Sequence, residues 1–231
     1  MATWLTDDYE EITTDLTTYT FTAMDIGTAV ATRVAVALLY WRDTASNDID
    51  NVTIGGVAAT QMLKLAFDSG GGGGSTSGLA VYAAVVPSGT TADVVMELST
   101  GAIRAACRLR TADDISLTAH DTLEASGADP LVGVINLAED GLICAAMANN
   151  DTTSTVAWTG VTELFEEIIE AGSMWSGAYH DAGTEEANRP VEADFTGTAG
   201  DHLMIAVSFA LNVVGGSSIP VKMFAYRRRR V

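Results

Sequence analysis

Lysine, cysteine and long apolar runs are scarce in this sequence of 231 residues, and each scarcity excludes a class of protein. The chain has only two lysines and 12 basic residues against 30 acidic ones, a formal net charge of −18. A surface of this charge repels nucleic acid and anionic membranes, so we expect neither as a partner. Every uninterrupted apolar run falls short of the ~18 residues that a membrane-spanning helix needs. Residues Met1–Asp8 lack a basic segment followed by an apolar one, so we expect no signal peptide.

Cys107 and Cys144 are the only cysteines. Two cysteines alone cannot supply the four ligands of a structural zinc site. Cys107 alternates with Ile103, Ala105 and Leu109, which is the pattern of one buried strand face. Because an unpaired cysteine packs like a small hydrophobic residue, we predict a buried free thiol rather than a disulfide.

Alternating apolar residues predict β-strands over most of the chain, beginning with Tyr19–Met24. The longest run is Arg33–Trp41, in which large and small apolar side chains alternate. Val34, Val36, Leu38 and Tyr40 fall on one face, and Ala35 and Ala37 on the other. Since both faces are apolar, we expect this strand at the centre of a sheet.

The segment Val52–Thr60 joins a β-branched run to Gly55-Gly56, which predicts a turn or a close backbone approach within a sheet. Val156–Leu164 repeats it, so that Gly160-Val161 aligns with Gly56-Val57. We therefore predict that Gly56 and Gly160 hold backbone conformations that are costly for other residues. After Gly160 the apolar side chains follow a helical spacing as far as Ile169. The repeat predicts strand there instead, and we favour strand.

In later strands the apolar residues occupy the same alternate positions in both halves of the chain. This match favours two similar β units, about residues 18–110 and 131–211. Val191, Ala193 and Phe195 repeat Val94, Met96 and Leu98 at a constant offset of 97, and Tyr179 matches Tyr82. Leu203, Ile205, Val207 and Phe209 match Ile103, Ala105, Cys107 and Leu109, which leaves Arg104, Arg108 and Arg110 on the solvent side. A slip of one residue would reverse every face, so shared parity favours a duplication. The alternative is the alternation common to all antiparallel proteins.

These strands predict an all-β fold, an antiparallel β-sandwich of two sheets that is jelly-roll-like and forms one domain over residues 18–211. Residues 1–17 are expected to form an N-terminal arm with little regular structure, and residues 111–130 to link the two units. Gly70–Gly74 predicts a flexible connection, because the Gly-Lys-Ser/Thr of a phosphate-binding loop does not follow it. Residues 212–231 are expected to be a linker and a basic C-terminal arm.

Catalytic and metal-binding motifs are missing from the sequence. Each histidine has an aspartate neighbour, in His120-Asp121, His180-Asp181 and Asp201-His202, but neighbours in a strand point to opposite faces. Neither a Gly-x-Ser-x-Gly elbow nor a His-Glu-x-x-His motif occurs. The oxygen-rich Asn149–Thr153 lacks the spacing of an EF-hand loop. With 30 carboxylates, chance proximity explains any acidic pair. We predict a non-enzymatic protein without cofactor or metal.

Four segments together resemble a loose group of virion proteins of tailed bacteriophages. They are Asp25–Thr28, Arg33–Leu38, Val52–Thr60 and Leu79–Gly89. The resemblance covers roughly residues 18–211 and implies a jelly-roll-like sandwich displayed in many copies on a head or tail, with no catalytic residues. It leads us to expect a head decoration or cement protein on the virion surface, a homo-oligomer made in the host cytoplasm. A major capsid protein or a tail protein would be its neighbour.

Two sets of residues are candidates for binding. We expect docking to a neighbouring virion protein through Phe224, Tyr226, Arg227, Arg228, Arg229 and Arg230, because arginine pairs well with carboxylates. The alternative function is a carbohydrate-binding module or tail-fibre domain that recognises a host surface. Trp158, Trp175 and Tyr179 would then stack on sugars, although aromatic residues more often pack in a core.

Overall fold

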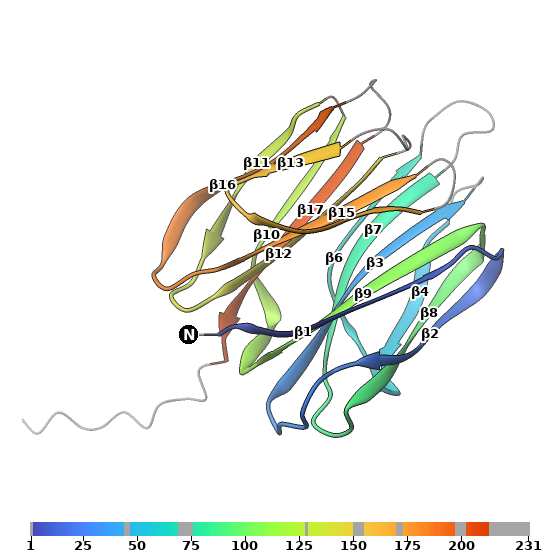
Figure 1. The fold of residues 1–231 in the computed structure, drawn as a ribbon, viewed down its shortest axis with the longest axis horizontal. Coiled ribbons are helices and arrows are strands. Elements are labelled where there is room, and N and C mark those ends of the chain that lie inside the picture. The colour runs from blue at the N-terminus through green and yellow to red at the C-terminus, as the bar shows by residue number, and fades with distance from the viewer. Residues whose placement is uncertain are drawn as a thin grey trace, which may run out of the picture.

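Four antiparallel β-sheets stack as layers in a computed structural model of the protein (Figure 1). The structure describes residues 2–43, 47–68, 76–127, 129–149, 155–169, 173–196 and 202–212. Its described residues form strands, turns and loops, and none of them belongs to a helix that could cross a membrane. The expected all-β, antiparallel class is confirmed. The expected number of two sheets was wrong.

The first half of the chain forms two of the sheets. Sheet A contains, in spatial order, β1 (Trp4–Ile12), β9 (Arg104–Asp113), β3 (Arg33–Asp43), β7 (Thr76–Val85) and β6 (Thr60–Asp68). Sheet B contains β2 (Leu16–Asp25), β8 (Thr91–Ala102), β4 (Ile49–Ile54) and β5 (Val57–Ala58). The strand β3 lies in the middle of sheet A, as its two apolar faces predict.

The second half forms the other two sheets. Sheet C contains β10 (Ile115–Gly127), β17 (His202–Leu211), β12 (Leu142–Asn149), β15 (Met174–Asp181) and β14 (Thr162–Ile168). Sheet D contains β11 (Leu131–Leu137), β16 (Glu186–Thr196) and β13 (Thr155–Thr159). The segment after Gly160 is therefore strand β14, which confirms the preference for strand over helix.

Three apolar cores separate the four sheets, which follow the order B, A, C, D (Figure 1). The B–A core contains Phe21, Trp41 and Met96, and the C–D core contains Met147 and Met204. Between them lies a core shared by the two halves. It contains Val34, Val36, Leu38 and Tyr40 of β3 on the sheet A side and Leu203, Ile205, Val207 and Phe209 of β17 on the sheet C side. Because sheets A and C are covered on both faces, their central strands β3 and β12 are apolar on both faces over most of their length.

The strand order of sheet C repeats that of sheet A. If β1, β2, β3, β4, β6, β7, β8 and β9 are matched in chain order with β10 to β17, then β1-β9-β3-β7-β6 becomes β10-β17-β12-β15-β14. The same matching turns β2-β8-β4 of sheet B into β11-β16-β13 of sheet D. Only β5 has no counterpart among the described strands.

Two of the residue matches made from the sequence were wrong, because the matched residues lie on opposite faces of corresponding strands. The row beginning at Leu203 packs between sheets A and C, whereas Ala105, Cys107 and Leu109 pack between A and B. The counterparts of this second row in β17 are Met204 and Ala206, which pack between C and D. Likewise Tyr82 faces sheet B, while Tyr179 lies against Arg110 of sheet A. In a strand that is apolar on both faces, alternation alone does not distinguish the two faces.

Glycines shape both turns that the sequence singled out. Gly55 and Gly56 have φ values of 60° and 75° in the tight turn between β4 and β5, and Gly160 has a φ of 82° after β13. The prediction that Gly56 and Gly160 adopt left-handed conformations is confirmed. A Cβ atom on Gly160 would overlap the carbonyl oxygen of Pro190, whereas a Cβ on Gly56 would meet nothing within 4 Å.

Strands form in two segments that the sequence assigned to other roles, the N-terminal arm expected to have little regular structure and the expected link between the two units. Residues 4–12 of the expected N-terminal arm form β1, which pairs with β9 along its length. Residues 115–127 of the expected link form β10, which pairs with β17. Carboxylates of β1 accept backbone hydrogen bonds from β2: Asp8 from Asp25 at 2.6 Å and Glu10 from Thr22 at 2.6 Å. These hydrogen bonds stabilise the acidic strand β1, whose composition alone predicts an arm.

Candidate functional site

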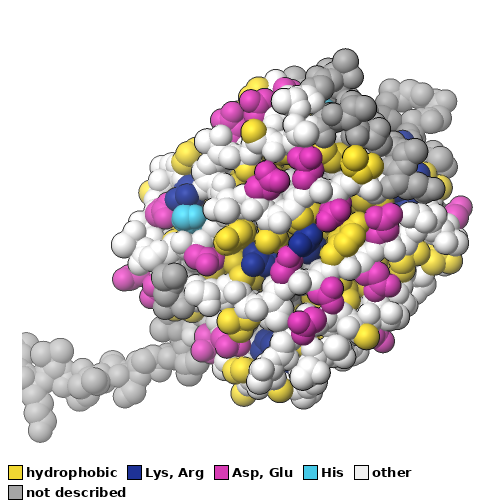
Figure 2. Space-filling model, viewed as in Figure 1, with side chains coloured by type: hydrophobic (Ala, Val, Ile, Leu, Met, Phe, Trp, Pro, Cys, Tyr) yellow, Lys and Arg dark blue, Asp and Glu magenta, His cyan; other side chains and the backbone are white. Residues whose placement is uncertain are grey.

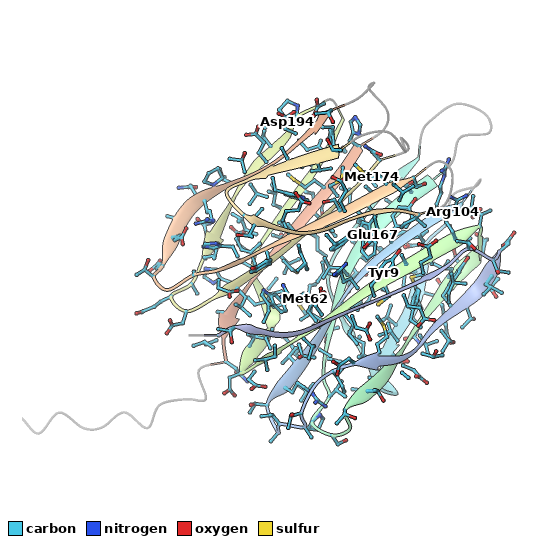
Figure 3. The ribbon with its side chains drawn as sticks, viewed as in Figure 1. Tyr9, Met62, Arg104, Glu167, Met174 and Asp194 are labelled. Carbon is cyan, nitrogen blue, oxygen red and sulfur yellow. The ribbon has the colours of Figure 1, made fainter. Side chains whose placement is uncertain are left out.

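Arginines of strand β9 occupy the interface between sheets A and C. Arg108 donates from Nε to Asp7 Oδ1 at 2.7 Å, and its guanidinium carbon lies 4.3 Å from the centroid of the Phe165 ring. The same group lies 5.9 Å from the ring of Tyr9, and a second nitrogen is 3.9 Å from Glu167. Figure 3 labels Tyr9 and Glu167, which approach from sheet A and sheet C respectively. One arginine thus connects three strands of two sheets.

Arg110 is the most deeply buried charge of this interface, with 7% of its surface exposed. Its guanidinium carbon lies 4.8 Å from the ring centroids of both Trp4 and Tyr179, a cation–π arrangement. Burial lowers the pKa of Arg110, and the nearby carboxylates of Asp7 and Asp181 oppose that shift. Burial also raises the pKa of Asp181, against the opposing charge of Arg110. Through these contacts Arg110 joins β1, β9 and β15, which indicates a structural role for this residue.

The arginines predicted to face solvent therefore face another sheet. Arg104 donates from Nη1 to the carbonyl oxygen of Ile169 at 2.9 Å, and Arg42 beside it donates to Ser173 Oγ at 2.7 Å. The prediction that these arginines face solvent was wrong because it assumed two sheets. In a protein of two sheets, this face of β9 would be exposed to solvent. Figure 2 shows basic side chains, Lys or Arg, among hydrophobic ones near the centre of the face in view, with carboxylates scattered around them.

The three aromatic residues proposed for sugar stacking do not form one exposed platform. Trp175 has 0% exposure, and its ring packs against Phe165 with 4.7 Å between centroids. Trp158 is half-buried and donates from Nε1 to Ser176 Oγ at 2.8 Å. Tyr179 lies under the guanidinium of Arg110. Only Trp158 keeps part of its surface in water without covering a buried charge.

The histidines are separated and have different neighbours. His180 Nε2 lies 3.2 Å from Glu186 Oε1, and Arg189 pairs with the same carboxylate. Burial raises the pKa of Glu186, but the hydrogen bonds from Arg189 and His180 outweigh it and lower the pKa overall. His202 is buried and stacks on Phe195 with 4.2 Å between centroids. Among the described residues no group of three or more His, Cys, Asp or Glu side chains could hold a metal ion.

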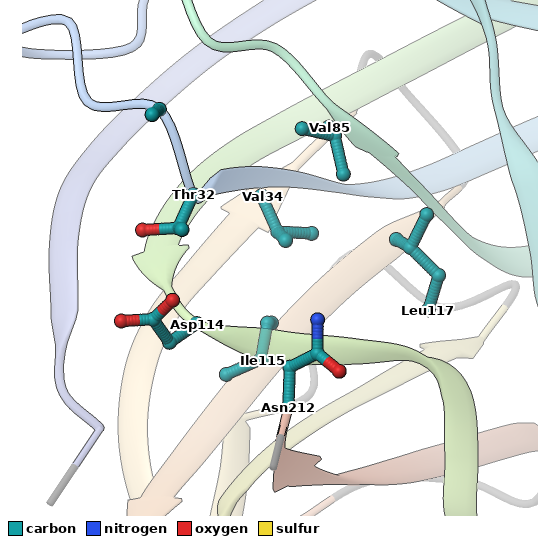
Figure 4. A pocket seen from close by; sticks show the side chains of 8 residues that line it. Thr32, Val34, Val85, Asp114, Ile115, Leu117 and Asn212 are labelled. Atoms are coloured by element: carbon teal, nitrogen blue, oxygen red, sulfur yellow. The ribbon is translucent and has the colours of Figure 1, made fainter. Parts of the chain in front are cut away.

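The feature that sequence reasoning missed is a pocket of about 310 Å³ at one end of the A–C interface (Figure 4). Its lining residues are Ala31, Thr32, Val34, Val85, Asp114, Ile115, Leu117 and Asn212. They come from β3, β7, β10 and the turns beside them, with Asn212 directly after β17. No local motif could have revealed the pocket, because these segments meet only when the two halves stack.

Comparison with known proteins does not assign this site: no family model, curated protein or solved structure matches the chain. The residues predicted to dock a partner, Phe224, Tyr226 and Arg227–Arg230, lie outside the described part of the chain, as does Gly70–Gly74.

Proposed function

We propose that this protein is a non-enzymatic structural component of a tailed-phage virion, displayed on the particle surface as a head decoration or cement protein. The observation that carries the proposal is the strand pairing within each half of the chain. In the first half β1 pairs with β9, β2 with β8, β3 with β7 and β4 with β5. In a jelly roll the first strand pairs with the last, the second with the next-to-last, and so on inward. This architecture is common in viral capsid and lectin domains.

The second half supports the same plan and the idea of a duplication. There β10 pairs with β17, β11 with β16 and β12 with β15. The innermost pair is not closed, because β13 belongs to sheet D and β14 to sheet C. On this proposal the chain consists of two jelly-roll-like units that stack through sheets A and C and present sheets B and D outward.

The outward surfaces suit a protein packed in many copies. The outer face of sheet D carries Glu192 and Asp194 beside the exposed Val132 and Val134. Apolar side chains beside carboxylates offer contact area to a neighbour, while the net charge of −18 opposes unspecific self-association. The expected partners are further copies of this chain and a major capsid or tail protein.

Immunogold electron microscopy on purified particles, taken from lysates of the host that carries this gene, tests the proposal. We expect gold particles over the heads in a regular distribution and the protein at a fixed stoichiometry in purified particles. A soluble host protein of similar size serves as the control for carry-over. Absence of the protein from washed particles would contradict the proposal.

The carbohydrate-binding alternative now depends on Trp158, because Trp175 is buried and the partly exposed Tyr179 lies under the guanidinium of Arg110. Jelly-roll folds also occur in lectins, so the fold does not decide between the two functions. A glycan array with the wild type and Trp158→Ala separates them. Specific binding that the substitution abolishes, together with labelling at the tail tip, would favour the alternative.

A further inference from the structure

The pocket at the end of the A–C interface combines an apolar floor with one carboxylate at its rim. Val34 and Ile115 are buried at its base, whereas Val85 keeps 38% of its surface exposed. Asp114 is exposed at the rim with a φ of 58°. Figure 4 shows Val34, Val85, Ile115 and Leu117 around the opening, with Asp114 and Asn212 beside them. Apolar surface left in water next to a carboxylate suits a ligand that carries both apolar and cationic groups.

The walls of the pocket are joined by backbone hydrogen bonds. The amide of Asp114 donates to the carbonyl oxygen of Thr32 at 3.2 Å, and the amide of Asn212 donates to the carbonyl oxygen of Asp114. These bonds connect the start of β3, the turn between β9 and β10, and the residue after β17. The site is therefore formed by both halves of the chain, and its walls are preformed.

We infer that this pocket of about 310 Å³ takes up one or two apolar side chains from the C-terminal segment Ile219–Tyr226 of the same chain, with Arg227–Arg230 near the carboxylate of Asp114. The chain itself leads there, since Asn212 lines the pocket and residues 213–231 follow it. The segment Val213–Ser218 contains Gly215-Gly216, which permits a reversal of direction. Seven residues from Asn212 to Ile219 span up to ~23 Å when extended, ample for a return to the rim.

Chemistry and charge favour this occupant over others. Residues 219–226 carry Ile219, Val221, Phe224 and Tyr226, which are apolar or aromatic. Without the arginines Arg227–Arg230 the formal charge of −18 becomes −22, so the segment is cationic and the body strongly anionic. A short linker also holds the segment at an effective concentration in the millimolar range, which favours the chain's own pocket over that of another molecule in dilute solution.

Disulfide trapping in the full chain tests the inference. Ala225→Cys in the segment is combined with Thr32→Cys at the pocket rim. The matched control combines Ala225→Cys with Ser126→Cys, an exposed site near the other end of β10, ~35 Å along the strand from Ile115. The native Cys107 and Cys144 are buried and do not compete. Because a disulfide requires Cα atoms within ~7 Å, the rate of trapping reports proximity.

At micromolar protein and low salt we expect the Thr32→Cys pair to form an intramolecular disulfide at least tenfold faster than the Ser126→Cys pair. Adding Phe224→Ala, or Asp114→Asn, should reduce that advantage severalfold, as should 1 M salt. Asparagine tolerates the left-handed backbone of Asp114, so the second substitution removes charge without strain. Val85→Trp, which fills the pocket, should also reduce trapping, whereas Val132→Trp on sheet D should not.

Equal trapping at the two sites would overturn the inference, as would disulfide-linked dimers as the main product at low protein concentration. Circular dichroism of each variant confirms that its strands are intact. The experiment uses the isolated chain, so its outcome is independent of whether the protein belongs to a virion.

Discussion

The guanidinium carbon of Arg108 lies 4.3 Å from the centre of the Phe165 ring, and this contact crosses from sheet A to sheet C. The same guanidinium holds Asp7 through two nitrogens. A planar guanidinium can meet a ring face and a carboxylate together, which the compact ammonium of lysine cannot reproduce. The contact therefore depends on arginine rather than on positive charge alone.

Arg108→Lys should lower the melting temperature by about 3–6 °C, which corresponds to ~1.5 kcal/mol for a chain of this size. A double-mutant cycle with Phe165→Leu isolates the contact between the two residues. We expect a coupling free energy of ~0.5–1 kcal/mol, measured by urea unfolding. Strictly additive effects of the two substitutions would mean that the contact contributes nothing to stability.

The two glycines with left-handed backbones should respond differently to alanine. Both pay the cost of φ near +80°, about 1 kcal/mol, but only at Gly160 would the new Cβ also overlap a backbone atom, the Pro190 carbonyl oxygen. We expect Gly56→Ala to lower the melting temperature by a few degrees and Gly160→Ala by at least twice as much. Gly56→Asn should be nearly neutral, because asparagine accepts this conformation. Equal losses at Gly56 and Gly160 would show that the contact with Pro190 relaxes freely.

Both cysteines should be unreactive in the folded protein. Burial raises the pKa of Cys144 to about 12 and raises that of Cys107 well above its usual value. A raised pKa keeps the thiol protonated, so the reactive thiolate stays rare even at pH 9. A bulky aromatic disulfide reagent should therefore label neither thiol in native protein and both after denaturation. Rapid labelling of one thiol in the native state would mean that its strand opens locally.

The sequence allowed the strands, the central position of β3 and the special glycines to be predicted, because each leaves a local signal. Alternation reveals which residues of a strand share a face, and a Gly-Gly pair reveals a turn. The four-layer stacking could not be predicted in this way. Whether Arg108 faces water or a second sheet depends on contacts with Phe165, which is far away in the chain.

The strands β1 and β10 were missed for a related reason. Each is an edge strand of its sheet, and each carries many polar residues that composition assigns to an arm or a link. Their strand conformation depends on partners elsewhere, such as the pairing of Glu10 with Cys107 and of Thr122 with Val207. The pocket was missed in the same way, because Val34 and Ile115 become neighbours only after the sheets stack.

The two halves should unfold together, in one transition, although their sheets repeat one strand order. The core between sheets A and C takes Val36 and Leu38 from the first half and Ile205 and Val207 from the second. Separating the halves would expose this apolar surface and break the contact between Arg108 and Phe165, so neither half can lose its structure without destabilising the other.

Calorimetry should then give a single peak. Ile205→Ala should shift that whole peak downward by about 5–15 °C, since such a truncation costs ~2–5 kcal/mol. Ile168→Ala, at a side chain that is 57% exposed, is the control and should shift it little. Hydrogen exchange adds a local readout, because amides of β8 in sheet B and of β16 in sheet D should lose protection together in the Ile205→Ala variant. Two separate peaks, or a protected β8 beside an exchanged β16, would mean that the halves are independent folding units joined by a weak interface.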